Sequence, residues 1–185
     1  MKIYIIERNE DKFKYLVPYF DDLEDVVLIN SDFRTFLQNN YVQCIVSPAN
    51  SKGFMTGGFD MAIIDYFGRT VQDKVQNYII ENCDGEQKVG TSFIIDINKE
   101  HKLIHTPTMI RPSKIKDERV IYHCMRQTLL TAKQNNIESI LIPMFGGSTG
   151  GLSPKLIAKI MRYAYDQINL KDEEINLENI RKLKY

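Results

Sequence analysis

The chain has 185 residues, 43% of them hydrophobic, so it is long enough for one domain with a sizeable core. It carries 24 Lys plus Arg and 24 Asp plus Glu, and this balance excludes a global electric field that would attract nucleic acid or an anionic membrane. No apolar run approaches the ~20 residues of a spanning helix, and the N-terminus becomes charged too soon for a signal peptide. We therefore expect one domain, residues 1–185, in an intracellular, cytoplasmic protein that contacts neither membrane nor nucleic acid.

Short apolar runs alternate along the chain with longer segments of helical period, which is typical of an α/β fold. The predicted strands are 2–7, 25–30, 42–47, 91–97, 102–107 and 139–145, and the predicted helices are about 10–20, 33–39, 58–82, 117–136, 154–168 and 172–183. Several strands are nearly all apolar, as strands covered on both faces are. The pattern predicts a mixed or mostly parallel sheet with helices on both faces, and a charged, peripheral, solvated helix at 172–183. Such sheets bind ligands beyond the carboxyl ends of their strands.

The stretch "SPANSKGFMTGGFD", Ser47 to Asp60, follows one apolar strand and is rich in glycine. Glycine permits backbone angles and close approaches that a Cβ forbids, and Gly58 stands just before the apolar-periodic "FDMAIIDYFG". A glycine-lined helix N-terminus is suited to an anion because its first amide groups lack partners within the helix. This loop therefore predicts an anion site.

A second loop, "FGGSTGGLSP" from Phe145 to Pro154, follows the strand "SILIPM" and precedes another helix. It holds four glycines with Ser148 and Thr149, and it ends in Ser153 and Pro154, which are typical of an N-cap and a first helical position. Either loop alone is more often a tight turn than a phosphate site, but two such loops together suit a diphosphate. Neither contains the P-loop lysine motif or a GxGxxG turn, which disfavours NTP hydrolysis and dinucleotide redox chemistry.

These residues resemble the macrodomains, a family that binds ADP-ribose. The first ligand loop of that family commonly reads as an apolar strand, NAAN, a few residues, a glycine run and VDGAI, and "IVSPANSKGFMTGGFDMAI" has the corresponding order. The second loop resembles the family's STG-containing phosphate loop, and "LIHTPTM" resembles its IHTVGP strand. The resemblance runs from "INSD" through the helix after Pro154, most closely to a divergent branch of microbial and viral macro-like proteins. It implies a three-layer α/β/α fold with a central mixed, mostly parallel sheet.

The resemblance also implies roles for individual residues. Asn50 and Asp60 match, with the same ten-residue separation, two positions by which the MacroD-like hydrolases of the family work. In these roles Asn50 offers a donor and an acceptor to the distal ribose, while Asp60, its charge stabilised by a helix start, orients the attacking water. A plainer interpretation of Asp60 is an acidic residue in a first helical turn. The predicted ADP-ribose-binding residues are Asp32, Phe33, Ala49, Asn50, Phe54, Gly57, Gly58, Phe59, Phe145, Gly146, Gly147, Ser148, Thr149, Gly150, Gly151 and Leu152.

Four features bear on this resemblance. Asp32 resembles the family's early aspartate, which accepts the adenine amino group, and it is equally well placed as the N-cap of "FRTFLQ". Ser47 stands where many members have the first asparagine, and the second loop is about one residue longer than usual. The basic pair Arg111 and Lys114 is either a solvated turn or part of the pocket rim.

No metal site or cofactor is predicted. The histidines lack metal-ligand spacing, and His105, within an apolar strand, is expected to be a hydrogen-bonded core or rim residue. Cys44, Cys83 and Cys124 are odd in number without a CxxC motif, so they are expected to be reduced structural thiols. Of the aromatic candidates for stacking on adenine or capping a ribose, Phe54 and Phe145 lie in the two loops, although aromatic residues beside apolar runs are more often core.

Two classes of function remain open from the sequence. As an enzyme, the protein would hydrolyse ADP-ribosyl linkages on modified macromolecules or in small ADP-ribose derivatives. As a module, it would only bind ADP-ribose or a related NAD-derived nucleotide. Phosphatase action on ADP-ribose phosphorylated at the distal ribose (ADP-ribose-1''-phosphate) also occurs in the family. The expected partner is ADP-ribose or an ADP-ribosylated macromolecule, and a monomer is the default expectation because the sequence does not fix the oligomeric state.

Overall fold

The computed structural model describes residues 1–183. The strands are β1 (Lys2–Ile6), β2 (Val26–Ile29), β3 (Cys44–Ser47), β4 (Phe93–Asp96), β5 (Lys102–His105) and β6 (Ser139–Pro143). The helices are α1 (Glu10–Phe13), α2 (Val17–Phe20), α3 (Phe33–Asn39), α4 (Gly58–Phe67), α5 (Thr70–Asn82), α6 (Arg119–Gln134), α7 (Pro154–Asp166), the 3-10 turn η1 (Asp172–Glu174) and α8 (Glu178–Lys182).

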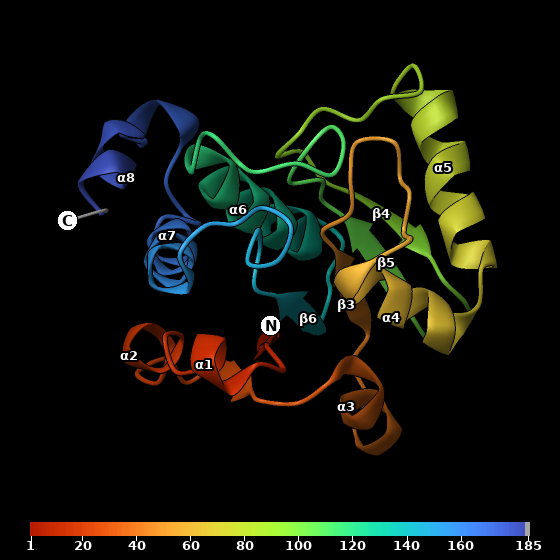
Figure 1. Ribbon diagram of the computed structural model, residues 1–185, viewed down its shortest axis with the longest axis horizontal. Helices are drawn as coiled ribbons and strands as arrows, with labels where there is room; N and C mark the ends of the chain where they lie inside the picture. The colour runs from red at the N-terminus through yellow and green to blue at the C-terminus, as the bar shows by residue number, and fades with distance from the viewer. Residues whose placement is uncertain (184–185) are drawn as a thin grey trace.

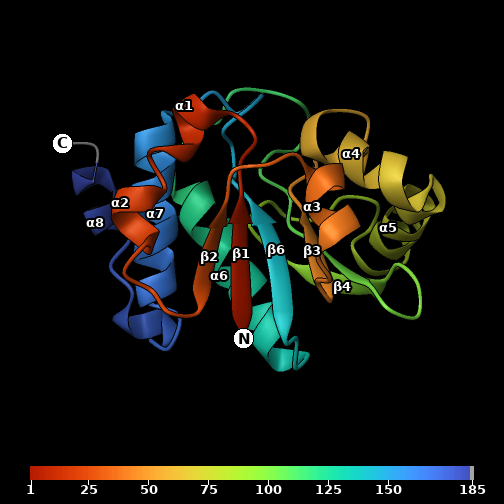
Figure 2. The same cartoon turned by 90° about the horizontal axis from the view of Figure 1, so that it is seen from below.

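Within these residues the strands form one six-stranded sheet in the order β2-β1-β6-β3-β5-β4. Pairing is parallel throughout except between β4 and β5, which are antiparallel. The predicted mixed, mostly parallel sheet is therefore confirmed. The carboxyl ends of β1, β2, β3, β5 and β6 all lie at one edge, which is the upper edge in Figure 2.

Alternating side chains of the sheet divide the core into two layers. Cys44 and Val46 of β3 face a core cluster that α2, α6 and α7 cover, whereas Ile45 faces a second cluster covered by α3, α4 and α5. Figure 2 shows these two groups of helices on opposite sides of the sheet. Strands buried on both faces must be apolar at successive positions, which is why β3 and β6 read as continuous hydrophobic runs. The three-layer α/β/α architecture is confirmed.

Two helices predicted as continuous are each divided in the structure. The predicted helix 10–20 consists of α1 and α2, and Pro18 occupies the first turn of α2, where a missing N–H costs no helical hydrogen bond. The predicted helix 58–82 breaks at Gly68, whose φ of 93° and ψ of 161° end α4 before α5 begins. These backbone angles belong to a region that glycine alone adopts at low cost.

The prediction of one continuous helix at 172–183 is also wrong, although much of the segment is exposed, as expected. The segment consists of η1 and the short α8, and Ile180 of α8 is fully buried in the same core cluster as α6 and α7. Its charged residues concealed a few apolar positions that pack inward. The segment does lie at one end of the molecule, beside α7, as Figure 1 shows.

We expect Gly68→Ala to lower the free energy of unfolding by about 1–3 kcal/mol, because a Cβ is strained at these backbone angles. Gly57→Ala is the matched control, since Gly57 has an extended φ of −162° and a Cβ built there meets no atom of residues 1–183 within 4 Å. Because alanine is a poorer N-cap than glycine, this control should itself lower stability by about 0.5–1 kcal/mol, which is less than Gly68→Ala. Urea unfolding of both variants measures the difference, and equal stability would contradict the strain argument.

Candidate functional site

The two glycine-rich loops lie side by side because of the strand order. Strands β3 and β6 are parallel neighbours, with Cys44 paired to Ile140 and Ile45 to Leu141. The loop after β3 (residues 48–57) and the loop after β6 (residues 144–153) therefore leave the sheet at the same edge. We call them the first loop and the second loop. Asp32, after β2, lies at the same edge but further along it, since β1 separates β2 from β6.

Asn50 holds the first loop together from inside. Its Nδ2 donates to the carbonyl of Phe54 at 2.9 Å, and its Oδ1 accepts from the amides of Lys52 at 3.1 Å and Phe54 at 3.4 Å. Its backbone forms an isolated parallel bridge with Met109, which ties the loop to the segment after β5. The expectation that Asn50 offers a sugar both a donor and an acceptor is wrong for this conformation. The oxygen already accepts two bonds, so it is not free for a sugar hydroxyl. The amide nitrogen donates only one of its two hydrogens, so one hydrogen remains for a ligand.

Asp60 lies in the first turn of α4, and its side chain is turned into the protein with 8% of the residue exposed. The hydroxyl of Ser47, a fully buried residue at the end of β3, donates to Asp60 Oδ1 at 2.6 Å. Burial raises the pKa of Asp60 to about 7, while the Ser47 hydrogen bond acts in the opposite direction. The prediction that the helix start would stabilise the charged form is therefore wrong in its net effect. A carboxyl group with this pKa can both accept and return a proton at neutral pH.

The N-terminus of α4 is open. Gly57 is its N-cap, Gly58 has a φ of 58°, and a Cβ built on either would meet no described atom within 4 Å. Gly57 has no side chain with which to cap the first amides, so these amides are available to an anion. The predicted glycine positions of the first loop thus lie beside free space.

The second loop is tightly packed on one side and exposed on the other. A Cβ at Gly150 would lie 2.6 Å from the carbonyl oxygen of Gly146 and 2.7 Å from Ile115 Cδ1, so glycine is required there by the loop itself. The amide of Ile115 also donates to the carbonyl of Gly150 at 3.0 Å. Ser148 and Thr149 are exposed. The loop is a fixed turn whose tip presents hydroxyl and backbone groups to solvent. Leu152 is partly buried against the core, Gly151 is exposed, and Ser153 is the N-cap residue of α7, followed by Pro154 as predicted.

The structure separates the predicted aromatic residues by burial. Phe145 and Phe33 are 0% and 3% exposed and belong to the core clusters, and Phe59 packs edge-on against Phe33 at 5.2 Å. The prediction that Phe145 stacks on a ligand is therefore wrong for its side chain, because its ring fills the core below the second loop. Ala49 is also buried. Phe54, at 52% exposed, projects from the first loop and is free to cover a ligand.

Asp32 is the N-cap of α3, as one of its two interpretations predicted. It accepts from the amide of Thr35 at 3.0 Å and from the Thr35 hydroxyl at 2.6 Å, and the hydroxyl is the main cause that lowers the pKa of Asp32. The residue is exposed, so capping does not prevent contact with a ligand. Its adenine role stays a prediction.

The surroundings of His105 and of the three cysteines indicate structural roles. His105 is fully buried, its Nδ1 bonds Gln87 Oε1, and burial lowers its pKa to about 3, so it is a neutral core histidine as expected. The cysteines are free in the described chain. Among residues 1–183 there is no cluster of three or more His, Cys, Asp or Glu that would hold a metal ion. No helix among them is long and apolar enough to cross a membrane.

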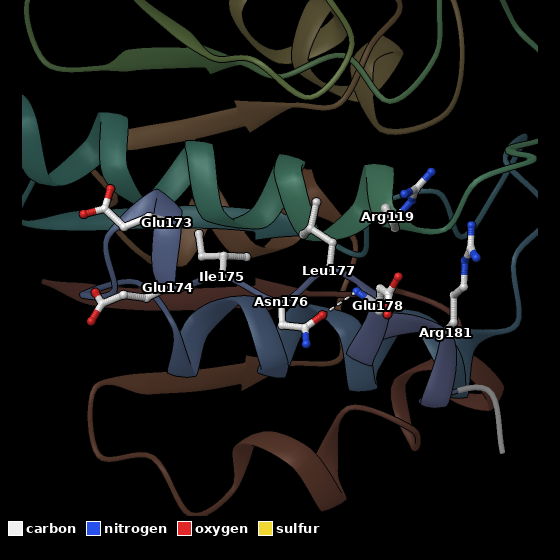
Figure 3. Close-up of a pocket in the computed structure, with 8 residues that line it drawn as sticks. All are labelled: Arg119, Glu173, Glu174, Ile175, Asn176, Leu177, Glu178 and Arg181. Carbon is white, nitrogen blue, oxygen red and sulfur yellow. Dashed lines mark hydrogen bonds between the residues drawn. The ribbon is translucent and has the colours of Figure 1, made fainter.

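A cavity of about 490 Å³ lies away from the two loops, against the C-terminal segment. Figure 3 shows Arg119 and Arg181 at one end of it and Glu173 and Glu174 at the other. Its lining mixes both signs of charge and includes none of the predicted site residues. The candidate site is instead the open surface between the two loops.

Comparison with known proteins agrees with the geometry. Residues 46–161 match the family model "Macro domain". The chain belongs to the macrodomain family. The macrodomain of Mycobacterium tuberculosis DarG is similar with a TM-score of 0.61 and 18% identity, covering 72% of this chain and 87% of that one. A variant macrodomain of Oceanobacillus iheyensis with ADPR has a TM-score of 0.59 and 19% identity, covering 72% and 75%.

Two further relatives extend the comparison. A Trypanosoma brucei macrodomain in complex with ADP-ribose has a TM-score of 0.54 at 20% identity, covering 68% of this chain and 53% of that one. An uncharacterized protein of Aquifex aeolicus is 29% identical over 119 residues, covering 63% of this macrodomain and 68% of the relative. At these identities the solved structures confirm the fold.

Sequence reasoning missed two contacts at the site. Ser47 was noted only as a departure from the family pattern, yet it is the hydrogen-bond partner of Asp60. A hydroxyl in the last position of a buried strand, beside a helix start that carries a carboxylate, is a usable signal for such a pair. Lys12 was not considered, although its Nζ donates to the carbonyl of Gly147 at 2.7 Å. No local sequence pattern predicts this contact, because the two residues are 135 positions apart in the chain.

The stability of the macrodomain should depend on pH through Asp60. Between the ordinary pKa of 3.8 and the folded value of about 7, the unfolded chain is ionised while the folded protein keeps its proton. The contribution of Asp60 to stability is therefore lost as the pH rises through this window. We expect the stability gained by Asp60→Asn over wild type to grow by about 1–4 kcal/mol from pH 4 to pH 7.5.

Thermal and urea unfolding of both proteins across this pH range gives the difference between their stabilities. His105 titrates in the opposite direction, but it is present in both proteins, so its effect cancels in this difference. Asp65→Asn, at an exposed position of the same helix, is the control and should give a flat difference. A flat difference for Asp60→Asn would show that Asp60 ionises at its ordinary pKa.

Proposed function

We propose that this macrodomain binds ADP-ribose in the surface between its two glycine loops. The observation that carries the proposal is the meeting of the open α4 N-terminus at Gly57 and Gly58 with the glycine turn 146–151, after neighbouring parallel strands. Backbone amides from both sides suit a diphosphate. Solved relatives of the same fold are described with ADP-ribose or ADPR, which supports the choice of ligand.

The remaining parts of ADP-ribose have candidate partners at the same edge of the sheet. Asp32 would accept the adenine amino group, the free amide hydrogen of Asn50 would reach the distal ribose, and Phe54 would cover the ligand. These roles extend the proposal along the row of strand ends from β2 to β3. They require the ligand to lie across the ends of β1 and β6, as ligands do in open parallel sheets.

We further propose that the bound ADP-ribosyl group is hydrolysed with Asp60 as general base. A water molecule attacks the anomeric carbon of the distal ribose, and its proton passes to the Asp60 carboxylate. The bond from this carbon to the modified group breaks, the leaving group departs with the electron pair of that bond, and Asp60 returns the proton to it. The raised pKa supports this role, because a base is most effective when its pKa lies near the working pH. Ser47 would fix the carboxylate orientation through its 2.6 Å bond.

A binding module without turnover is the second candidate. It is favoured by the Asn50 side chain, whose oxygen is already satisfied within the first loop. In this case Asp60 and Ser47 would form a structural pair below the site. Binding and turnover measured on the same protein separate the two candidates.

The binding proposal predicts that ADP-ribose binds more tightly than AMP, because AMP lacks the diphosphate and the distal ribose. Gly58→Ala should weaken ADP-ribose binding by about 10-fold or more, since a methyl group hinders the approach of phosphate to the α4 amides. Gly85→Ala is the matched control: Gly85 also has a positive φ and open space, but it lies outside both loops. Calorimetric titration gives the affinities.

Equal affinity for AMP and ADP-ribose would contradict the pocket, and equal affinity of the two glycine variants would contradict the use of the α4 amides. Unfolding curves of both variants check that a Cβ at a positive φ lowers the free energy of unfolding by the same amount in each.

The catalytic proposal predicts that Asp60→Asn slows release of ADP-ribose from modified proteins by about 10²–10⁴ while binding persists. The wild-type rate should rise with pH up to about 7, because only the ionised carboxylate accepts a proton. Release of labelled ADP-ribose from acidic-residue-modified and serine-modified proteins is the assay, with Asp65→Asn as control. Binding by wild type without any release would leave the binding module as the function.

A further inference from the structure

Lys12 brings a cation to the second loop from a part of the chain outside the matched family region. Its Nζ donates to the carbonyl oxygen of Gly147 at 2.7 Å, and the side chain is partly buried. The family model covers residues 46–161, so this residue belongs to the N-terminal segment that precedes it. The contact is therefore a feature of this chain rather than of the matched motif.

The fold explains why Lys12 lies there. Strand β1 is paired in parallel with β6, with Ile6 opposite Pro143, so the segment after β1 leaves the sheet beside the second loop. Asn9 then starts α1 by accepting the amide of Lys12 at 3.1 Å, which fixes the backbone of the lysine. Figure 2 shows α1 next to the loop that enters α7.

The positive charge of Lys12 is not neutralised by its neighbours. Asp11, the preceding residue, is paired with Lys14 at 2.9 Å, and Glu7 accepts the amide of Asn9. Within residues 1–183 the ion pairs do not include Lys12. An ammonium group has three donors, and Gly147 occupies one of them. The other two form no hydrogen bond with residues 1–183, so they are free to bind a ligand beside the second loop.

A second lysine, Lys114, lies near Gly151 of the same loop. The stem of Lys114 passes 3.7 Å from the position of a Cβ built on Gly151, and the neighbouring Ile115 is bonded to Gly150. Lys114 is exposed, whereas Lys12 is held by its bond to Gly147. The stem of Lys114 therefore lies beside Gly151, whereas the ammonium of Lys12 is held at Gly147.

We propose that Lys12 is a diphosphate-binding residue of this macrodomain, which orders the second loop through Gly147 and supplies a full positive charge to the ligand. This inference rests on the proposed function and deepens it. Backbone amides offer only partial charges to a diphosphate. A fixed ammonium adds an electrostatic attraction that acts on a charged nucleotide and not on a nucleoside. The ligand class follows: nucleoside diphosphate derivatives, recognised partly by their charge.

The experiment compares wild type with Lys12→Met, which removes the charge, and Lys12→Arg, which keeps it. Lys14→Met is the matched control, because Lys14 lies two residues further on, is exposed and pairs with Asp11. Calorimetry measures binding of ADP-ribose, ADP and adenosine at about 0.1 M and about 1 M salt, where the Debye length is about 10 Å and about 3 Å. Thermal unfolding confirms that each variant is folded.

We expect Lys12→Met to weaken binding of ADP-ribose and ADP by about 3–10-fold at the lower salt concentration, and by less at the higher one. Adenosine binding should not change, Lys12→Arg should retain most of the affinity, and Lys14→Met should match wild type. Unchanged ADP-ribose affinity in Lys12→Met would overturn the inference while leaving the proposed function intact. An equal loss for adenosine and ADP-ribose would also overturn it, because Lys12 would then act through loop shape alone. A wild-type protein that binds none of these ligands would refute the proposed function and this inference with it.

Discussion

The parallel pairing of β6 with both β1 and β3 decides where the two glycine loops and the α1 segment lie. Parallel strands end at the same edge of a sheet, so three loops that are far apart in the chain emerge there together: the α1 segment, the first loop and the second loop. A one-residue slip would exchange the side chains of these strands between the two core layers, so the packing of both layers fixes the register. The site thus depends on the packing of two core layers that contribute no ligand contact themselves.

The burial of Asp60 is the costly element of this arrangement. A carboxylate withdrawn from water loses hydration, and one hydroxyl from Ser47 compensates only part of the loss, so the proton is retained up to about pH 7. Residues with such pKa values cluster at functional sites, although structural pairs also produce them. The open N-terminus of α4 lies in the same helical turn, which brings the buried carboxyl group close to the surface where a ligand would bind.

Gly58 and Gly150 are required to be glycine for different physical reasons. At Gly58 the backbone angle requires glycine while the surrounding space is empty, whereas at Gly150 the space is filled by the carbonyl of Gly146 and by Ile115. There is therefore room for a ligand at Gly57 and Gly58, although Gly53, earlier in the first loop, is packed against Val75 and Ile79. The second loop is a rigid turn with an exposed tip. Polar groups of both loops are also used within the protein: the Asn50 side chain bonds Phe54, and the Gly147 carbonyl accepts from Lys12.

The sequence by itself determined the fold class, the strands, both loops and the N-caps at Asp32 and Ser153, because apolar periodicity, glycine and capping residues act over a few neighbouring positions. The same reasoning did not predict the burial of Ile180, because the C-terminal segment is mostly charged and this burial depends on α6 and α7. Only the tertiary structure decided that Phe145 faces the core, that Asn50 bonds its own loop, that Asp60 is buried against Ser47 and that Lys12 reaches Gly147. Burial, and with it the pKa of a carboxyl group, is a property of everything packed around a residue, and long-range packing leaves no local pattern in the chain.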